Sequence, residues 1–508
     1  MIASSFQSTL LEFKKSKRKS TLLLILVVIL INLCYLFIGT KKSDIAGIPQ
    51  PWEAILFYIP LINSLFLSVL MAVLASRSMD LEHKGGTWNL LQTMQSKSSI
   101  FLGKILYGLF WLIAFGVLEM AATIVLAKCM GFPELPPIRG VMLTISSEII
   151  GGMVIYQLQL ILSLCFSGQF AALSINLCGT LAGFFLMYVD DRILTPWSLM
   201  GALRVLNMDY QQGDAYSTYT WNTVPFFYWL IAVLYLVGTL FIGLWLYSRI
   251  DEGSLSVFSQ RSRQTASVHF GLPVELIKLK RSPVWIAFII MPVISALIGV
   301  FNFSINQGVL KFSWAELWTQ QSLFLGIFFL SPLIAIFCSL LWRMEHNGTN
   351  WNVILTMESP AKIVRDKLLT ASGISALCIL WIGLLYLASG KIIGLGSALP
   401  KEFYESMLCG ILACIAIAAV QIYLSLIIRS FAIPVGIALG GGLAGIMFLT
   451  QGWGFFLPYA MLQMGLRSTN LTNDINIPAF IAVSCVYVLI FFVLSVYHIK
   501  HKDSKTQE

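Results

Sequence analysis

Two stretches of the chain pair a glutamate with a histidine, residue types that could do acid–base chemistry or bind a metal. They are LEHKGGTWNLLQTM at 81–94 and MEHNGTNWNVILTM at 344–357, here called the repeated motif. A zinc site of the H-E-x-x-H kind needs two histidines one helical turn apart, and each copy has only one. Neither copy holds a serine or cysteine nucleophile. The sequence therefore predicts no metal site and no catalytic site, and the chain is not expected to be an enzyme.

Two other carboxylates could do chemistry because they lie inside apolar segments. Glu119 and Glu148 have no acidic counterpart in the second half of the chain, where Ile382 and Gly410 or Cys409 stand. A carboxylate within a membrane span suggests a substrate pathway or a binding contact. The alternative is a solvated position near the outer end of each span. We interpret both as possible substrate-pathway residues.

The composition predicts a polytopic membrane protein. The chain is 57% hydrophobic and 11% charged, against roughly 45–50% and 25% in soluble domains, and its mean hydropathy is +0.82. Apolar runs long enough to cross a bilayer recur along it. The first run follows a basic segment but is longer than a signal-peptide core, so we expect it to be retained. About twelve spans are predicted, at 21–39, 54–76, 104–127, 143–167, 169–189, 225–248, 284–302, 321–342, 367–389, 404–428, 430–450 and 477–497.

The chain repeats itself at an offset of about half its length. The two copies of the motif are 345 − 82 = 263 residues apart, and Pro196 and Pro458 keep nearly that shift. The sequence predicts an all-α fold of two parallel six-helix halves with amphipathic connecting and coupling helices. The halves are expected at 1–250 and 273–508, with a polar cytoplasmic linker at 251–272.

The basic residues predict the orientation. With the amino terminus in the cytoplasm, the cytoplasmic segments hold more than two thirds of the 33 Lys and Arg residues. Both termini and both copies of the motif are then cytoplasmic. The net charge of +9 lies where it would meet anionic lipid, so no nucleic-acid partner is expected. The nine cysteines lie mostly in apolar runs without a C-x-x-C pair, which argues against disulfides and zinc sites.

Each copy of the motif has the pattern of a short amphipathic helix. Gly85 and Gly348 permit a turn, after which Thr87 and Asn350 are good helix N-caps. Trp88 and Trp351 would then project from short helices ending at 94 and 357. We expect these helices to dock on a symmetric cytoplasmic partner, and the alternative is that they pack on their own spans or on lipid. The segments 12–20 and 275–283 also match and would suit connecting helices along the membrane surface.

The pattern E-x-x-G-x-x-W-x-x-x-L-T-x-x-S…K after the second span resembles the type-2 ABC exporter permeases, above all those of lantibiotic-immunity and related antimicrobial-peptide transporters. The resemblance covers both halves, although most such permeases are half-size chains that pair. It implies ATP-driven export of a membrane-active peptide across a bacterial plasma membrane, for immunity or resistance. The chain has no G-x-x-x-x-G-K-[ST] loop. ATP and Mg are therefore expected on separate ABC ATPase subunits, in two copies, and no cofactor on this chain.

The resemblance assigns roles to residues in both copies. ATPase docking falls on Glu82, Gly85, Trp88, Asn89, Glu345, Gly348, Trp351 and Asn352, and the connecting helices hold Glu12, Lys17, Arg18, Glu275, Lys280 and Arg281. The first copy departs from the pattern with Gln92 where Leu355 stands in the second. Membrane lipid and an amphiphilic peptide complete the expected partners.

Two other classes of protein fit parts of the sequence. A major-facilitator secondary transporter also has twelve spans in two parallel halves, but the Gly–Asp–Arg arrangement of its loops is missing here. A membrane sensor could bind peptide without moving it, and it would not stimulate an ATPase.

Overall fold

The chain folds as two helical units in the computed structural model. Unit 1 covers Met1–Ser262 and unit 2 covers Arg263–Glu508, and each is described by itself. The boundary falls within the predicted linker 251–272, which lies outside the described residues. The structure describes residues 2–17, 21–42, 50–85, 95–132, 135–166, 169–189, 194–209, 217–249, 275, 284–307, 310–346, 350–396, 398–428, 432–472 and 474–501.

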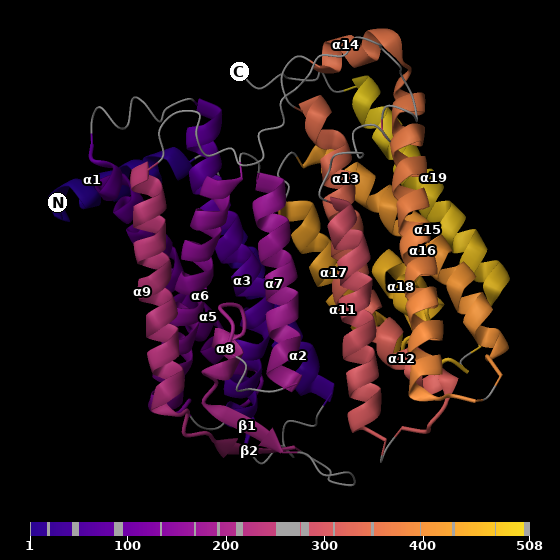
Figure 1. Cartoon of the computed structure of the whole chain (residues 1–508), viewed down its shortest axis with the longest axis horizontal. Coiled ribbons are helices and arrows are strands. Elements are labelled where there is room, and N and C mark those ends of the chain that lie inside the picture. The colour runs from indigo at the N-terminus through magenta and orange to yellow at the C-terminus, as the bar shows by residue number, and fades with distance from the viewer. Residues whose placement is uncertain are drawn as a thin grey trace. The chain divides into compact units, whose positions relative to one another are not determined.

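Unit 1 has a short first helix, six long helices and a small hairpin (Figure 1). The hairpin of β1 and β2 is antiparallel, with Leu206 paired to Trp221, and it lies at the end of the unit opposite α1. Sequence analysis did not predict it. The elements are α1 (Ile2–Ser16), α2 (Thr21–Lys42), α3 (Pro51–Gly85), α5 (Lys97–Cys129), α6 (Ile138–Cys165), α7 (Gln169–Val189), α8 (Leu199–Ala202), β1 (Leu206–Asp209), β2 (Thr218–Trp221) and α9 (Phe226–Arg249).

Unit 2 repeats this order without a hairpin among its described residues. Its second span is interrupted by a π-helical turn, η2, between α12 and α13. The elements are α11 (Val284–Ile305), α12 (Trp314–Phe324), η2 (Leu325–Phe329), α13 (Leu330–His346), α14 (Asn350–Met357), α15 (Pro360–Ile393), α16 (Lys401–Ile427), α17 (Ala432–Thr450), η3 (Gly454–Phe456), α18 (Pro458–Gly465) and α19 (Ile477–His501).

The helices confirm the predicted all-α membrane fold. Ten of those in the described part of the chain are long and apolar enough to cross a bilayer. The remaining two predicted spans are occupied by α2 and α7. The closely spaced predicted spans are separate helices, because α6 ends at Cys165 before α7 begins, and α16 ends at Ile427 before α17 begins.

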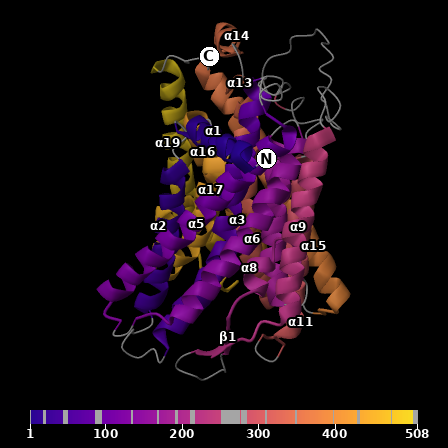
Figure 2. The same ribbon diagram turned by 90° about the vertical axis from the view of Figure 1, so that its left-hand side faces the viewer.

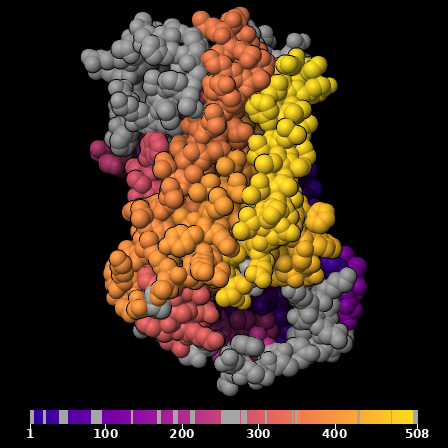
Figure 3. Space-filling view, turned by 90° about the vertical axis from the view of Figure 1, so that its right-hand side faces the viewer, coloured from indigo at the N-terminus to yellow at the C-terminus, as the bar shows by residue number. Residues whose placement is uncertain are grey.

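Burial separates central from peripheral helices within each unit. Of the most apolar 18-residue stretch of each helix, 83% is buried in Pro51–Met79 and in Trp314–Arg343, but only 17% in α9 and in α19. In Figure 2 α9 lies along one side of unit 1, and in Figure 3 α19 covers much of the visible face of unit 2. The second span of each half is therefore the core element, and the sixth presents apolar side chains outward.

The segments between the fifth and sixth spans pack alike in the two halves. A β-carbon on Gly179 would lie 2.3 Å from the Trp197 ring, and one on Gly441 would lie 2.3 Å from the Tyr459 ring. Each pair is separated by 18 residues, and the two pairs are 262 apart in the sequence. An aromatic residue after the fifth span thus sits on a glycine of that span in both halves. Trp197 lies in the turn before α8, and Tyr459 lies in the first turn of α18.

The second and third spans are longer than a bilayer requires. A helix of 35 residues such as α3 is roughly 52 Å long at 1.5 Å per residue, against a hydrocarbon core of about 30 Å. The last turns of α3 carry Glu82 and His83, and those of α13 carry Glu345 and His346. The helix ends that bear the repeated motif therefore extend beyond the apolar layer.

Close packing of α17 on the π-helical turn gives a first testable prediction. A β-carbon on Gly442 would lie 2.1 Å from the carbonyl oxygen of Ile327, whereas one on Gly436 meets nothing within 4 Å. We expect Gly442→Ala to cost about 1–3 kcal/mol and to lower the thermal unfolding midpoint in detergent. Gly436→Ala, on the same helix, is the control and should be neutral or stabilising. Equal midpoints for the two variants would contradict this packing.

Candidate functional site at the repeated motif

The second copy of the motif is largely described, and the first only in part. Glu82 and Gly85 lie in the last turns of α3, while Trp88 and Asn89 lie outside the described residues. In the second copy Glu345 ends α13, and Trp351 and Asn352 belong to α14; Gly348 lies outside the described residues. Of the predicted connecting-helix residues, Glu12, Lys17 and Glu275 are described, whereas Arg18, Lys280 and Arg281 are not.

A buried lysine organises the second copy. Lys367, near the start of α15, has no exposed side-chain surface. Its Nζ lies 3.0 Å from Glu275 Oε1 and 2.7 Å from Glu345 Oε1, and it donates to the Leu341 carbonyl oxygen at 2.6 Å. The ammonium also lies 4.7 Å from the centre of the Trp342 ring. We call these residues the second lysine cluster.

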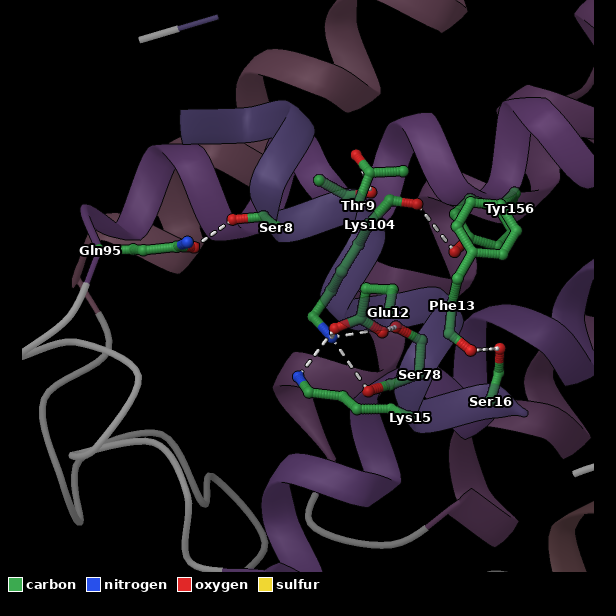
Figure 4. Close-up of polar contacts among 11 residues, drawn as sticks. Ser8, Thr9, Glu12, Phe13, Lys15, Ser16, Ser78, Gln95, Lys104 and Tyr156 are labelled. Atoms are coloured by element: carbon green, nitrogen blue, oxygen red, sulfur yellow. Dashed lines mark hydrogen bonds and ion pairs between the residues drawn. The ribbon is translucent and has the colours of Figure 1, made fainter. Parts of the chain in front are cut away.

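The first half has an equivalent cluster at an offset of 263 residues. Lys104 Nζ lies 3.1 Å from Glu12 Oε1 and donates to the Ser78 hydroxyl at 2.9 Å and the Ser78 carbonyl at 3.0 Å (Figure 4). Lys15 adds a second ion pair to Glu12 at 2.9 Å. Glu12, Ser78 and Lys104 occupy the positions of Glu275, Leu341 and Lys367. In both halves the lysine joins the segment before the first span to the end of the second span.

The surface helix α1 also holds the flank of the first motif copy. Ser8 donates to the Gln95 side chain, and Ser5 shares a hydrogen bond with Ser99 at 3.3 Å (Figure 4 includes Ser8 and Gln95). α1 extends over Ile2–Ser16, so it begins ten residues before the segment 12–20 that the sequence repeat marked. It meets α2 at 78°. The orientation of the connecting helix along the membrane surface stays a prediction.

Electrostatics explains why these clusters are rigid. A buried ammonium is stable only when it is paired, and removing one partner of a buried ion pair costs about 3–5 kcal/mol. Burial raises the pKa of the Glu12 carboxyl, but the ammonium groups of Lys104 and Lys15 lower it by more, so its pKa lies below the ordinary 4.5. Glu12 is therefore ionised at neutral pH and bound to both cations.

The short helix α14 is attached to its own unit by Trp351. The ring is 7% exposed and stacks on Trp342 at 5.7 Å between centroids, with His346 at 5.9 Å. This differs from the expectation of a projecting tryptophan, because two aromatic groups of α13 offer the ring an apolar surface. Met357, which is 54% exposed, and Thr356 form the outer face of α14. A continuous chain of contacts runs from Trp351 through Trp342 to Lys367.

A serine N-cap marks the start of the third span in each half. α5 begins at Lys97 with Ser96 as its N-cap, whose side chain accepts from the Ser99 amide. α15 begins at Pro360 with Ser359 as its N-cap. These caps end each motif at a defined residue and start the third span, which carries the buried lysine two turns later.

The structure brings the two intramembrane carboxylates together. Glu119 and Glu148 are each 1% exposed and accept hydrogen bonds from the same nitrogen, Nδ2 of Asn63, at 2.7 Å. Both carboxylates are buried, so the alternative from the sequence, a solvated position near the end of each span, is wrong. Sequence analysis missed Asn63 and Asn32, which binds Glu119 at 2.7 Å. Their signal was an asparagine in the middle of an apolar run.

Both halves of the chain match one known protein family. Residues 10–183 and residues 272–445 each match the family described as ABC-2 family transporter protein. The chain belongs to this family. The two matches are 262 residues apart at both ends and together cover more than half of this ABC-2 transporter chain. A comparison with individually curated proteins gives no match.

The family defines what this ABC-2 protein is in outline. It is the membrane subunit of an ABC transporter, and not itself an enzyme, and its two halves are tandem copies of one permease unit. The lysine clusters fall inside the matched segments, since Glu12, Lys104, Glu275 and Lys367 all lie within them. The clusters are thus built into the part of each half that carries the family pattern.

Removing the buried ammonium should destabilise unit 2. In Lys367→Met, Glu275 and Glu345 would be buried without their cation, and we expect a loss of about 3–5 kcal/mol. The matched control is Lys362→Met, because Lys362 is 44% exposed and its pair with Glu358 should contribute little. Thermal unfolding of the purified variants in detergent measures both. The triple variant Lys367→Met with Glu275→Gln and Glu345→Gln should recover part of the loss, and no recovery would contradict the charge explanation.

The lowered pKa of Glu12 predicts an acid-dependent loss of stability. A carboxyl whose pKa is lowered by folding stabilises the fold above its unfolded pKa, and that contribution disappears as the pH falls through the folded value. Wild type should therefore lose stability below pH 4.5 more steeply than Glu12→Gln. Unfolding midpoints measured against pH test this, with Glu53→Gln as the control at the start of α3. Parallel curves for wild type and Glu12→Gln would overturn it.

Proposed function

We propose that this chain is the permease of an ATP-driven exporter that expels a membrane-active, lantibiotic-like peptide and so confers immunity or resistance. Separate ABC ATPase subunits, one per half, would drive it by docking on the repeated motif. The observation that carries the proposal is the second lysine cluster together with α14. A short helix with an exposed outer face is joined by contacts to three spans of its unit.

The contacts give a path for force. A pull on α14 would act on Trp351, which stacks on Trp342 of α13. Trp342 in turn donates to the Ile422 carbonyl of α16 at 3.0 Å, and His346 lies 3.2 Å from the Ser425 carbonyl of the same helix. The Lys367 ion pairs extend the path to α15 and to Glu275. Motion of α14 would therefore be shared by α13, α15 and α16 and would not be lost in a flexible loop.

Orientation and location follow from charge. We propose a bacterial plasma membrane with both termini and both motif copies in the cytoplasm, where ATP is available. The excess of Lys and Arg on that side supports it. The exposed apolar faces of α9 and α19 suit contact with lipid.

The choice of a peptide as substrate rests on the resemblance to lantibiotic-immunity permeases. Glu119 and Glu148 could attract a cationic peptide to the first half, where both are placed in the core of the unit. Neutralising both without any change in resistance would remove that part of the proposal.

Capture of the ATPase tests the docking surface. The full chain would be used to co-purify the ATPase encoded beside it, and ATP turnover would be measured in the same preparation. Thr356→Lys with Met357→Glu alters the outer face of α14 without touching Trp351, and we expect at least about a tenfold loss of captured ATPase, equivalent to about 1.4 kcal/mol. Ile392→Glu, at an 86% exposed apolar position elsewhere on α15, is the control and should capture normally.

A second variant separates docking from coupling. Trp88→Ala with Trp351→Ala should loosen the helices, so that turnover in the recovered complex falls more than capture does. If wild type captures no ATPase under any condition, the exporter proposal fails. If the ATPase binds but peptide never changes its turnover, the protein is a sensor of peptide and not its exporter.

A further inference from the structure

Four spans of unit 1 each contribute one polar side chain to a single buried cluster. The residues are Asn32 of α2, Asn63 of α3, Glu119 of α5 and Glu148 of α6, and none is more than 2% exposed. We call them the acid–amide cluster. It lies apart from the first lysine cluster along the same spans, and nothing in the proposed docking mechanism uses it.

The hydrogen bonds of the acid–amide cluster use every amide proton it has. Asn32 Nδ2 donates to Asn63 Oδ1 and to Glu119 Oε1, each at 2.7 Å. Asn63 Nδ2 donates to Glu119 Oε2 and to Glu148 Oε1, each at 2.7 Å. Two oxygens then have no hydrogen-bond partner among the described residues: Glu148 Oε2 and Asn32 Oδ1. Buried oxygens of this kind require a donor or a cation.

Two hydroxyls extend the polar surface by one helical turn. Thr123 is four residues after Glu119 on α5, and Thr144 is four residues before Glu148 on α6, so each shares a helix face with its carboxylate. Both are at most 1% exposed, and both hydroxyls lack a hydrogen-bond partner in the described part of the chain. Because consecutive spans run antiparallel, both threonines lie on the same side of the carboxylate pair.

No described basic residue balances the charge of the cluster. Both carboxylates bind one nitrogen, so they are close together, and neither forms an ion pair with a described basic residue. Two like charges held this near in an apolar interior cannot both ionise without compensation. Since no described group supplies a positive charge, the site is suited to a cation from solution.

The second half shows that the fold itself does not need the cluster. The aligned positions hold Ser295, Gly326, Ile382 and Gly410. Gly326 lies in the π-helical turn η2, and a β-carbon on Gly410 would lie 2.7 Å from Leu466. Six spans thus pack in the same order without a carboxylate pair, and its presence in unit 1 calls for a ligand.

We propose that the acid–amide cluster binds one small monovalent cation, a proton or a sodium ion, between Glu119, Glu148 and the Asn32 amide oxygen. The bound cation leaves the site with a single negative charge, which the asparagine amides stabilise. The cation holds α2, α3, α5 and α6 together. When it leaves, the two carboxylates would repel each other. The proposal goes beyond the exporter function and does not depend on it.

Infrared spectroscopy of the purified full chain in lipid vesicles tests whether the bound cation is a proton. A protonated buried carboxyl has a C=O band that differs from that of a carboxylate. In potassium buffer at neutral pH, wild type should show a band worth one carboxyl, and Glu119→Gln and Glu148→Gln should each lose it. Glu53→Gln is the matched control and should keep it. A folded variant elutes as a monodisperse peak in size-exclusion chromatography, and a misfolded one does not. If a variant misfolds, the spectrum of the wild type still tests the proposal.

Binding of radioactive sodium distinguishes the two cations. If the band is present in both potassium and sodium buffers, the ligand is a proton. If sodium removes the band, or if no band appears but sodium binds to wild type and not to Glu148→Gln, the ligand is sodium. Absence of both the band and sodium binding in wild type would overturn the proposal.

Discussion

A buried ammonium group that must be paired is the constraint on which each half depends. Lys104 and Lys367 have no exposed side-chain surface, so their charge is stable only while the partners stay in place. The partners come from the segment before the first span and from the end of the second. One lysine therefore sets where the surface segment lies and how the second and third spans cross near the motif.

The buried ammonium is surrounded by different groups in the two lysine clusters, and this distinguishes the two halves. In unit 2 two carboxylates and the Trp342 ring surround the ammonium, and the same ring receives Trp351 of α14. In unit 1 the Ser78 hydroxyl and carbonyl complete the site, and Lys15 adds a second cation to Glu12. A fused chain can diverge in this way because each half keeps its own frame. The acid–amide cluster of unit 1 is a second such divergence, placed where unit 2 has glycine and isoleucine.

Burial gives the remaining helices their roles. The second span is mostly buried within each unit, whereas most of the sixth span is exposed on the surface of its unit. Side chains that join the motif to the rest of a unit are therefore found on the second, third and fourth spans. The outer loops close the opposite end by setting Trp197 and Tyr459 on glycines of the fifth span. Each unit is thus held at one end by charge and at the other by close apolar contact.

Much of this architecture was decided by sequence alone. Apolar runs of span length and the offset of 263 residues depend only on local composition and spacing, and they predicted the helices and their division into halves. Glu12 and Glu275 were already matched by the sequence repeat. That each glutamate meets its lysine was decided by tertiary structure, because the partners are 92 residues apart and helical periodicity defines a face without saying which helix it meets. The inward direction of Trp351, the union of Glu119 with Glu148 through two asparagines, and the β1–β2 hairpin have the same origin. Each depends on contacts between segments that only packing brings together.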